Sequence, residues 1–401
     1  MTAALPTAEP AELPRAAPRG GAPARPDVLF ALVGDVRGSS RALRQLRALR
    51  DAGLSAEVLT LGPPLGDALG EGLPLDGRLR ARVLPTPPGR GPRFFWAAHR
   101  AFRAAALARP AGLYLASDLY TLPGLAEAAR HHGARLAFDS RELYAALDSS
   151  AGRPWVRGVW RAVERRAIRR ADAVFTVNRA IAERLSRAYG IPPPVVLHNA
   201  PARQPVPATD RLRRAAGIGD GPPIVLYQGG LRPGRGLPAL VDAVAAVPEA
   251  ALVVIGDGPM EAALRRQAAP LGDRVRFLGF VGPDELPALT AGADLGTLLI
   301  EPLTESLRLA LPNKLFEYLM AGVPVLAGPG PEVRRVVERY DVGLVADPAD
   351  PGAVAAALRR ALTDETARTR WRANAPRALD AHAWEHDAAR FQQTLLDLLN
   401  R

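Results

Sequence analysis

Short apolar runs alternate with amphipathic segments along most of the chain. In the first half the runs lie at 27–33, 56–61, 113–116, within 134–144 and at 171–177. In the second half they lie at 223–228, 251–256, 275–280, 293–300 and 323–328. Runs of this length suit strands that are buried on both faces, and the segments between them have the period of amphipathic helices. The pattern predicts an α/β protein with a doubly wound parallel sheet in each half.

Changes in composition suggest where the domains begin and end. Residues 1–26 are rich in Ala and Pro, and the spacing of the prolines predicts a disordered tail. We expect one domain at 27–200, a linker with one short helix at 201–221, and a second domain at 222–375. The segment 376–401 then predicts a terminal amphipathic helix.

The segment 311–328, LPNKLFEYLMAGVPVLAG, combines the start of a helix with charged residues. Pro312 is tolerated at a helix start, where the first-turn amides near Asn313 and Lys314 carry the positive end of the helix dipole. Glu317 lies about one turn further on, where a carboxylate can accept hydrogen bonds from a ribose. These residues predict a cradle for a nucleoside diphosphate, although an ordinary βαβ unit with a solvated Lys and Glu has the same pattern.

Other loops directly after predicted strands also suit an anion. In the second half they carry Gly229-Gly230 with Arg235, and Asp257 between two glycines. Glycines let the backbone approach a phosphate closely, and the arginine neutralises its charge. In the first half, the loop from Gly34 to Arg41 follows the first strand, at the edge where doubly wound sheets bind ligands.

Composition and charge narrow the class of protein. The chain has 401 residues, no cysteine and a net charge of +11, so disulfides and thiolate metal sites are excluded. Residues 1–200 contain 29 Arg and 17 acidic residues, whereas residues 201–401 contain 23 Lys plus Arg and 24 acidic residues. The basic first half favours an anionic partner such as a membrane surface, a phosphorylated lipid or nucleic acid. Without a signal-like or membrane-spanning apolar run, we expect a cytoplasmic protein.

Two predicted helices, 93–109 and 155–170, are basic and carry aromatic residues. The apolar positions of the second helix form one stripe with arginines opposite. The stripe fits either a helix packed on the core under a solvated face or a helix docked on a membrane. Nucleic-acid binding is supported only by charge, because no strand with interleaved aromatic residues is present in the pattern.

The second half resembles the donor domain of the retaining nucleotide-sugar glycosyltransferases of family 4. The segments that carry this resemblance are YQGGLRPGRG, VIGDGP, VRFLGFV and LPNKLFEYLMAGVPVLAG. The first half is similar to the acceptor domain of members that build bacterial surface polysaccharides, through SSRALRQLRALRDAGLSAEVLTL, SDLYTLPGLA, FDSRELY, RRADAVFTVN and LHNAP. The resemblance implies the GT-B fold, with two Rossmann-like domains and a C-terminal helix that crosses back to the first.

The resemblance also implies roles for matching residues of the second half. Arg235 and Lys314 would hold the donor diphosphate and act in catalysis, Glu317 would bind the ribose, and the backbone near Phe280 would contact the base. The other donor-side residues would be Gly229, Gly230, Asp257, Pro312 and Asn313.

On the acceptor side, the expected residues are Gly34, Arg41, Asp118, Asp139 and Glu142. The two aspartates have an alternative role, because an Asp at a strand end also caps the helix that follows. His198, just before the linker, could face the same site.

Two positions depart from the family pattern. Members commonly carry a Glu eight positions before the ribose-binding Glu, where this chain has Leu309. The first-half motif usually reads DSHEL and here reads DSREL, so Arg141 replaces a histidine near the reacting sugar. An arginine cannot act as a base at neutral pH, although it can hydrogen-bond a phosphate or a sugar hydroxyl. Arg141 is therefore a candidate catalytic residue. The alternative hypothesis is that the replacement of histidine by Arg141 has abolished activity.

The expected function is retaining transfer of a sugar from a nucleoside-diphosphate sugar to a hydroxyl acceptor, soluble or lipid-linked, in surface-polysaccharide or glycoconjugate synthesis. The family implies no bound metal or cofactor. The alternatives are a GT-B sugar-nucleotide epimerase and a non-catalytic sugar-nucleotide-binding homologue. Peripheral contact with an anionic membrane is an expected partner interaction, and nucleic acid is not.

Overall fold

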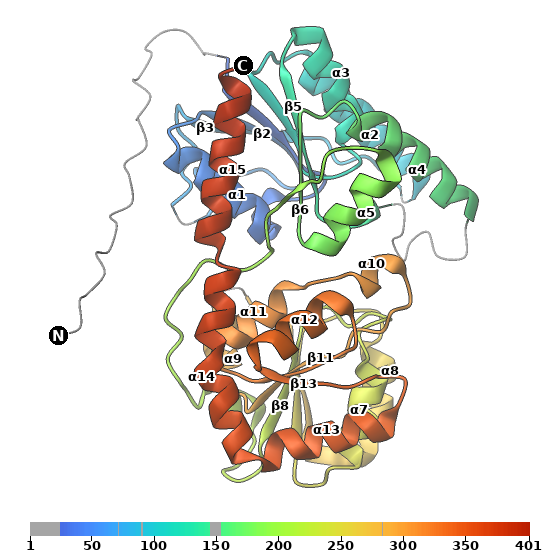
Figure 1. The fold of residues 1–401 in the computed structure, drawn as a ribbon, viewed down its shortest axis with the longest axis vertical. Coiled ribbons are helices and arrows are strands. Elements are labelled where there is room, and N and C mark those ends of the chain that lie inside the picture. The colour runs from blue at the N-terminus through green and yellow to red at the C-terminus, as the bar shows by residue number, and fades with distance from the viewer. Residues whose placement is uncertain (1–24, 71, 90, 145–153, 283) are drawn as a thin grey trace, which may run out of the picture. The chain divides into compact units, whose positions relative to one another are not determined.

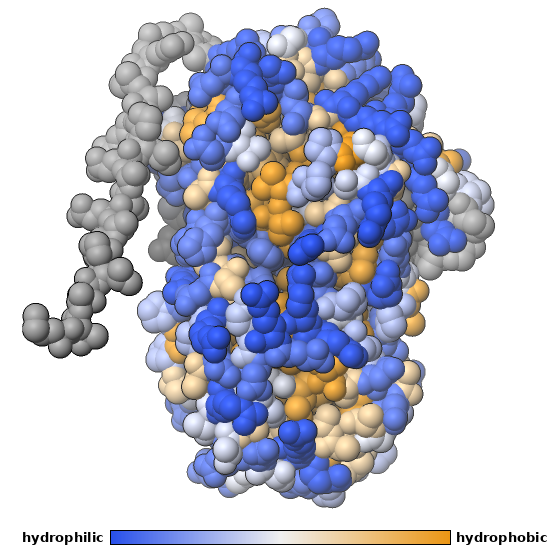
Figure 2. Space-filling model, viewed as in Figure 1, coloured by the Kyte–Doolittle hydropathy of each residue, from blue (hydrophilic) through white to orange (hydrophobic). Residues whose placement is uncertain are grey.

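A computed structural model describes residues 25–70, 72–89, 91–144, 154–282 and 284–401. The tail predicted at 1–26 lies outside these ranges except for its last two residues. On the face drawn in Figure 2, hydrophilic side chains predominate. Within the described ranges, every helix is too short or too polar to cross a bilayer.

The first seven strands form one sheet with the spatial order β3-β2-β1-β4-β5-β6-β7. They are β1 (Val28–Ala31), β2 (Ala56–Leu61), β3 (Leu79–Leu84), β4 (Leu113–Ala116), β5 (Arg135–Ser140), β6 (Ala173–Thr176) and β7 (Val195–Val196). The helices between them are η1 (Val36–Gly38), α1 (Ser40–Asp51), α2 (Pro92–Leu107), α3 (Leu122–His132), α4 (Pro154–Ile168) and α5 (Arg179–Tyr189). β1 pairs in parallel with both β2 and β4, which is the switch point of a doubly wound sheet. Figure 1 labels β2, β3, β5 and β6 of this sheet together with helices α1 to α5.

Sequence patterning did not predict β3, which lies in the Gly- and Pro-rich connection after β2. The strand alternates Arg80 and Arg82 with smaller apolar residues, so it lacks the continuous apolar run of its neighbours. As the edge strand next to β2, it can keep arginines on its solvent side.

The remaining six strands form a second sheet with the same relative order, β10-β9-β8-β11-β12-β13. They are β8 (Ile224–Gln228), β9 (Ala251–Ile255), β10 (Val275–Gly279), β11 (Leu295–Leu298), β12 (Val325–Ala327) and β13 (Gly343–Val345). The helices between β7 and β10 are α6 (Arg211–Ala216), α7 (Leu237–Ala245), α8 (Glu261–Ala268) and η4 (Ala269–Arg274). Those that follow β10 are α9 (Leu286–Thr290), α10 (Glu305–Arg308), α11 (Asn313–Met320), α12 (Pro331–Tyr340) and α13 (Pro351–Thr363).

Both faces of the second sheet are buried. Along β8, Ile224 and Leu226 pack into one apolar cluster, whereas Val225 and Tyr227 pack into the cluster on the opposite face. This alternation is the period of two expected for a strand with helices on either side. The continuous apolar runs of the sequence therefore report strands that are covered twice.

Contacts divide the chain into two compact units, one formed by residues 1–138 with 391–401 and the other by 139–390. α14 (Glu365–Ala381) begins upstream of the predicted terminal helix, because Asp364 caps it and Pro376 is accommodated inside it. α15 (Trp384–Leu399) ends in the first unit, as the resemblance implies. There Gln392 Nε2 donates a hydrogen bond to the carbonyl oxygen of Ala48 at 2.8 Å.

Candidate functional site

The loops that follow β8 and β9 lie so close together that two positions require glycine. A Cβ atom on Gly256 would lie 2.2 Å from the carbonyl oxygen of Gly229, and one on Gly258 would lie 2.4 Å from that of Leu231. The Leu231 N–H also donates to the carbonyl oxygen of Asp257 at 2.7 Å. The two loops form a bed of closely packed backbone at the carboxyl ends of these strands, where doubly wound sheets bind ligands.

Lys314 lies against this bed from the first turn of α11. Its Nζ atom is 4.2 Å from the centre of the Tyr227 ring, and a Cβ on Gly229 would lie 2.9 Å from Nζ. Removal from water lowers the pKa of Lys314 to about 7; the charge of Arg235 also lowers it, while Glu317 acts in the opposite direction. The amine is thus held where a bound anion would restore its positive charge.

Arg235 is placed by a second close approach of backbone. Gly236 has a φ of +65°, and a Cβ there would lie 2.1 Å from the carbonyl oxygen of Leu299, just after β11. The Gly236 N–H also donates to Glu301 Oε2 at 3.3 Å. The loop that carries Arg235 is therefore fixed to the end of β11, across the switch point from β8.

Glu317 also reaches the end of β8. Its Oε2 atom accepts a hydrogen bond from Gln228 Nε2 at 2.7 Å, and Gln228 is the last residue of β8. The structure thus brings Lys314, Glu317 and the loop at Gly229 together. Sequence reasoning did not identify Gln228, because its partner Glu317 is 89 residues away in the chain.

The helix α11 begins one residue later than expected. Pro312 occupies the extended N-cap position, and Asn313 is the first helical residue. Asn313 Oδ1 accepts a hydrogen bond at 2.6 Å from Nδ2 of Asn199, a residue that sequence reasoning did not select. Phe280, directly after β10, is 75% exposed and so presents its ring to solvent. The Asp257 side chain is also exposed, while its backbone joins the glycine loops.

In the first sheet, both oxygens of the Asp118 carboxylate accept hydrogen bonds from the backbone. The Val33 N–H donates to Oδ2 at 2.7 Å, and the N–H groups of Tyr120 and Thr121 donate to Oδ1 at 2.9 Å. These bonds tie the chain after β1 to the turn before α3, whose N-cap is Thr121 and has no side-chain cap bond, so the Asp118 carboxylate fixes the turn and does not cap the helix. Gly34 follows β1 with a φ of +116°, and among the described residues its Cβ position meets no atom within 4 Å.

The other acceptor-side candidates differ in their exposure. Arg41 in α1 is 3% exposed and Asp139 in β5 is fully buried. Arg141 is partly exposed and Glu142 is exposed, directly after β5. Only the last two therefore present their side chains to solvent without a rearrangement.

His198 is bound to Asp387, with Nδ1 3.2 Å from Oδ2. In the ranges that the structure describes, no group of three His, Asp or Glu side chains is close enough to hold a metal ion.

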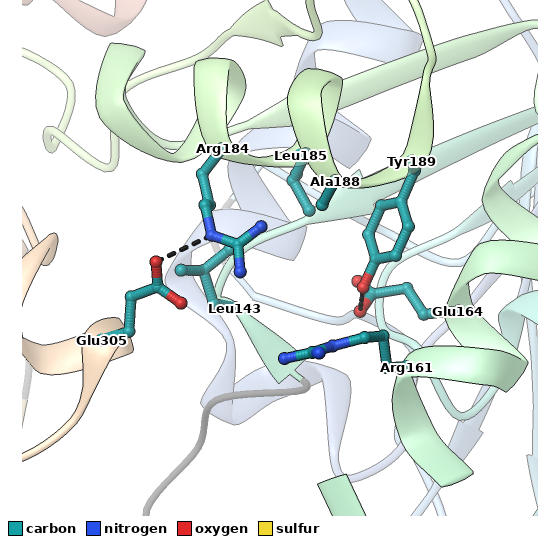
Figure 3. A pocket seen from close by; sticks show the side chains of 8 residues that line it. All are labelled: Leu143, Arg161, Glu164, Arg184, Leu185, Ala188, Tyr189 and Glu305. Carbon is teal, nitrogen blue, oxygen red and sulfur yellow. Dashed lines mark hydrogen bonds and ion pairs between the residues drawn. The ribbon is translucent and has the colours of Figure 1, made fainter. Parts of the chain in front are cut away.

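A small polar cavity lies between α4 and α5 (Figure 3). Its volume is about 20 Å³, enough for one water molecule. It is lined by Leu143, Arg161, Glu164, Arg184, Leu185, Ala188, Tyr189 and Glu305. The Tyr189 hydroxyl donates to Glu164 Oε2 at 2.5 Å, and burial raises the pKa of Glu164 to about 7. Sequence reasoning missed Glu164, although it lies four residues from both Trp160 and Ile168 on the apolar stripe of α4.

Two doubly wound sheets of the same relative strand order, one with closely packed glycine loops at the carboxyl ends of its strands, define a fold with two Rossmann-like domains. Family models support this assignment over most of the chain. Residues 208–378 match the model for glycosyl transferases group 1, and residues 38–200 match that for the glycosyl transferase 4-like domain. The chain belongs to this family of glycosyltransferases.

Two curated relatives match more than half of the chain. It is 32% identical over 260 residues to the GDP-mannose-dependent alpha-(1-6)-phosphatidylinositol monomannoside mannosyltransferase of Mycolicibacterium smegmatis, covering 58% of this chain and 65% of that protein. It is 30% identical over 216 residues to the 2-deoxystreptamine glucosyltransferase of Streptomyces kanamyceticus, covering 51% and 54%. The chain thus spans less than two thirds of the length of these relatives.

Solved structures share the fold across nearly the whole chain. Sucrose-phosphate synthase from Thermosynechococcus elongatus superposes with a TM-score of 0.75 at 21% identity, covering 94% of this chain and all of that one. Anabaena HepE in complex with UDP-glucose superposes with a TM-score of 0.72 at 19% identity, covering 92% and 99%. At these identities the likeness establishes the GT-B fold.

Proposed function

We propose that this protein transfers a sugar from a nucleoside-diphosphate sugar to a hydroxyl acceptor and retains the anomeric configuration. The observation that carries the proposal is Lys314, a desolvated amine held against the Gly229 loop, with Arg235 close enough to lower its pKa. Two cations beside closely packed backbone suit a diphosphate, and Glu317 one turn away suits a ribose. The named activities of the curated relatives support the same reaction class.

The proposed mechanism is a front-face displacement. The acceptor hydroxyl attacks the anomeric carbon on the side from which the diphosphate leaves, and the departing phosphate oxygen takes the hydroxyl proton. Lys314 and Arg235 stabilise the charge that develops on the leaving group, and the two loops hold it in place. Arg141, partly exposed after β5, would hydrogen-bond a sugar or phosphate oxygen.

A donor screen tests this proposal. GDP-, UDP- and ADP-sugars are compared by thermal shift and by release of the nucleoside diphosphate with candidate acceptors. We expect the nucleotide sugars of one base to stabilise the protein. Release of the nucleoside diphosphate should require an acceptor. The anomeric proton of the product, followed by NMR, should keep the donor's configuration. An inverted product contradicts retention, and an altered sugar nucleotide formed without an acceptor indicates the epimerase.

Variants of Arg141 distinguish an active enzyme from a non-catalytic homologue. If Arg141 serves turnover, Arg141→Ala should lose activity, whereas Arg141→His restores the common motif and should keep or raise it. Donor binding without release in all three forms would support the non-catalytic alternative. Equal activity in all three would place Arg141 outside the site.

The exposed side chains of helix α4 support peripheral docking of the protein at the cytoplasmic side of an anionic membrane. The acceptor would then be lipid-linked. Ala167 and Ile168 bury the end of its apolar stripe, but Trp155 is 69% and Val159 56% exposed, near several arginines. An exposed Trp beside arginines suits an anionic interface. We expect binding to phosphatidylglycerol vesicles that weakens with salt and with Trp155→Ala, but not with Leu303→Ala. Absence of cosedimentation at low salt would contradict the docking.

A further inference from the structure

Three polar side chains are buried directly behind Glu317. Gln228 is 2% exposed, Thr290 is 1% exposed and Tyr318 is fully buried. They come from β8, α9 and α11, segments that are far apart in the sequence. Buried polar groups of this kind are costly unless they are hydrogen-bonded, so their pairing defines one arrangement of the side chains around Glu317.

The Gln228 amide connects Thr290 to Glu317. Gln228 Nε2 donates to Glu317 Oε2 at 2.7 Å, and the Thr290 hydroxyl donates to Gln228 Oε1 at 2.8 Å. The same hydroxyl lies 2.8 Å from the carbonyl oxygen of Leu286, but it has only one proton to give. When that proton points to Gln228 Oε1, the amide is held with its NH2 group toward the carboxylate. The reversed amide would set an oxygen against the Glu317 oxygen.

The backbone of Gln228 is also fixed to α11. Its N–H donates to the Tyr318 hydroxyl at 3.1 Å, and that hydroxyl lies 3.3 Å from the carbonyl oxygens of Leu226 and Thr297. The side chain and the backbone of Gln228 therefore bind two consecutive residues of α11. The backbone bond fixes Gln228 beside α11, and from there its amide reaches the Glu317 carboxylate.

We propose that Gln228 and Thr290 are positioning residues that orient the Glu317 carboxylate toward the ribose hydroxyls of the donor and so set the preference for a ribonucleotide. The inference rests on the proposed function, in which Glu317 receives the ribose. Thr290 acts only through Gln228, and Gln228 acts through Glu317. Loss of either should weaken only that part of the affinity that depends on the ribose hydroxyls.

The experiment compares each nucleotide with its form lacking those hydroxyls. Dissociation constants are measured for GDP, UDP and ADP and for their 2′,3′-dideoxy forms. The wild-type protein should bind one ribonucleotide at least tenfold more tightly than its dideoxy form. Thr290→Val and Gln228→Met should weaken that ribonucleotide about tenfold and leave the dideoxy form within about twofold, since a hydrogen bond to a charged group has this magnitude. Thr290→Ser, which restores the hydroxyl, should recover the wild-type value.

Two controls separate positioning from structure. Thr297→Val removes another buried hydroxyl, bonded to the carbonyl oxygen of Leu226 at 2.9 Å, and should leave the preference for the ribonucleotide unchanged. Adding Thr290→Val to Glu317→Ala should have no further effect. Equal weakening of both nucleotide forms, or an unchanged preference in Thr290→Val and Gln228→Met, would overturn the inference. Wild-type protein that binds none of the nucleotides would instead overturn the proposed function.

Discussion

The carboxyl-end edges of the two sheets are built differently although the relative strand order is the same. In the second sheet, Gly236 and Gly256 have no room for a side chain, because backbone oxygens would lie 2.1 and 2.2 Å from a Cβ. In the first sheet, the Cβ positions of Gly34 and Gly38 meet no described atom within 4 Å, and the Asp118 side chain ties the loops together. The comparison teaches that one edge is held mainly by backbone packing and the other by hydrogen bonds to a buried side chain.

The largest expected effect is the loss of stability from a steric clash at the carboxyl-end edge of the second sheet. Gly256→Ala forces the β8 and β9 loops apart and should lower the free energy of unfolding by at least about 3 kcal/mol. Gly38→Ala, in the open loop of the first sheet, should change it by less than about 1 kcal/mol. Urea unfolding measures both. Similar values for the two variants would remove the distinction between the edges.

Lys314 tests how little space the second edge leaves. Lys314→Arg introduces a broad guanidinium where Nζ lies 4.2 Å from the centre of the Tyr227 ring, so turnover should fall about 100-fold. Arg232→Lys, an exposed change in the loop that follows β8, should keep turnover near the wild-type value. Lys314 is the single lysine, so reductive methylation can modify only this side chain and the N-terminal amine. Nucleoside diphosphate should protect Lys314 alone, and a fully active Lys314→Arg enzyme would contradict its role.

Glu164, on α4 and bonded to Tyr189 of α5, tests burial of a charge in the half of the chain that forms the first sheet. Its pKa is raised from 4.5 to about 7 by burial, so the folded state binds the proton more tightly than the unfolded state. The stability this provides is fully present below pH 4.5 and is lost as the pH rises through about 7. The difference in free energy of unfolding between Glu164→Gln and wild type should therefore rise by about 2 kcal/mol, in favour of Glu164→Gln, between pH 5 and pH 8. The exposed Glu183→Gln should gain nothing, and parallel pH profiles for Glu164→Gln and wild type would refute the assignment.

The smallest expected effect is a pH dependence of donor binding. Lys314 has a pKa of about 7, so part of the population must take up a proton when a diphosphate binds above that pH. Affinity should fall by up to about tenfold between pH 7 and pH 8. Titration of the nucleoside diphosphate between pH 6 and pH 9 measures this. Lys314→Met should bind weakly without the slope, and a wild-type profile as flat as that of Lys314→Met would contradict the prediction.

The sequence predicted the parts of the site that depend on local backbone. Glycines after apolar runs marked the loops at Gly229 and Asp257, and a Pro-Asn-Lys start marked α11. Each of these signals lies within a few residues and needs no knowledge of the partner strand.

The residues that it missed depend on contacts between distant segments. Gln228 meets Thr290 62 residues away in the chain, and Asn199 meets Asn313 114 residues away. Nothing local distinguishes a glutamine at a strand end that orients a carboxylate from one that is solvated. Asp118 is a different case. Its place at a strand end fits a helix cap and a ligand contact equally well, and only the structure shows the hydrogen bonds that it makes to the backbone.

The path of the chain between the compact units has a consequence for its synthesis. The chain leaves the first unit after residue 138 and returns to it at residue 391. A ribosome therefore delivers the whole of 139–390, including the anion site, before the residues that complete the first unit. Until Gln392 and the final turns of α15 emerge, the surface around Ala48 that they cover stays open in the nascent protein. The first unit to be translated is thus the last to be completed.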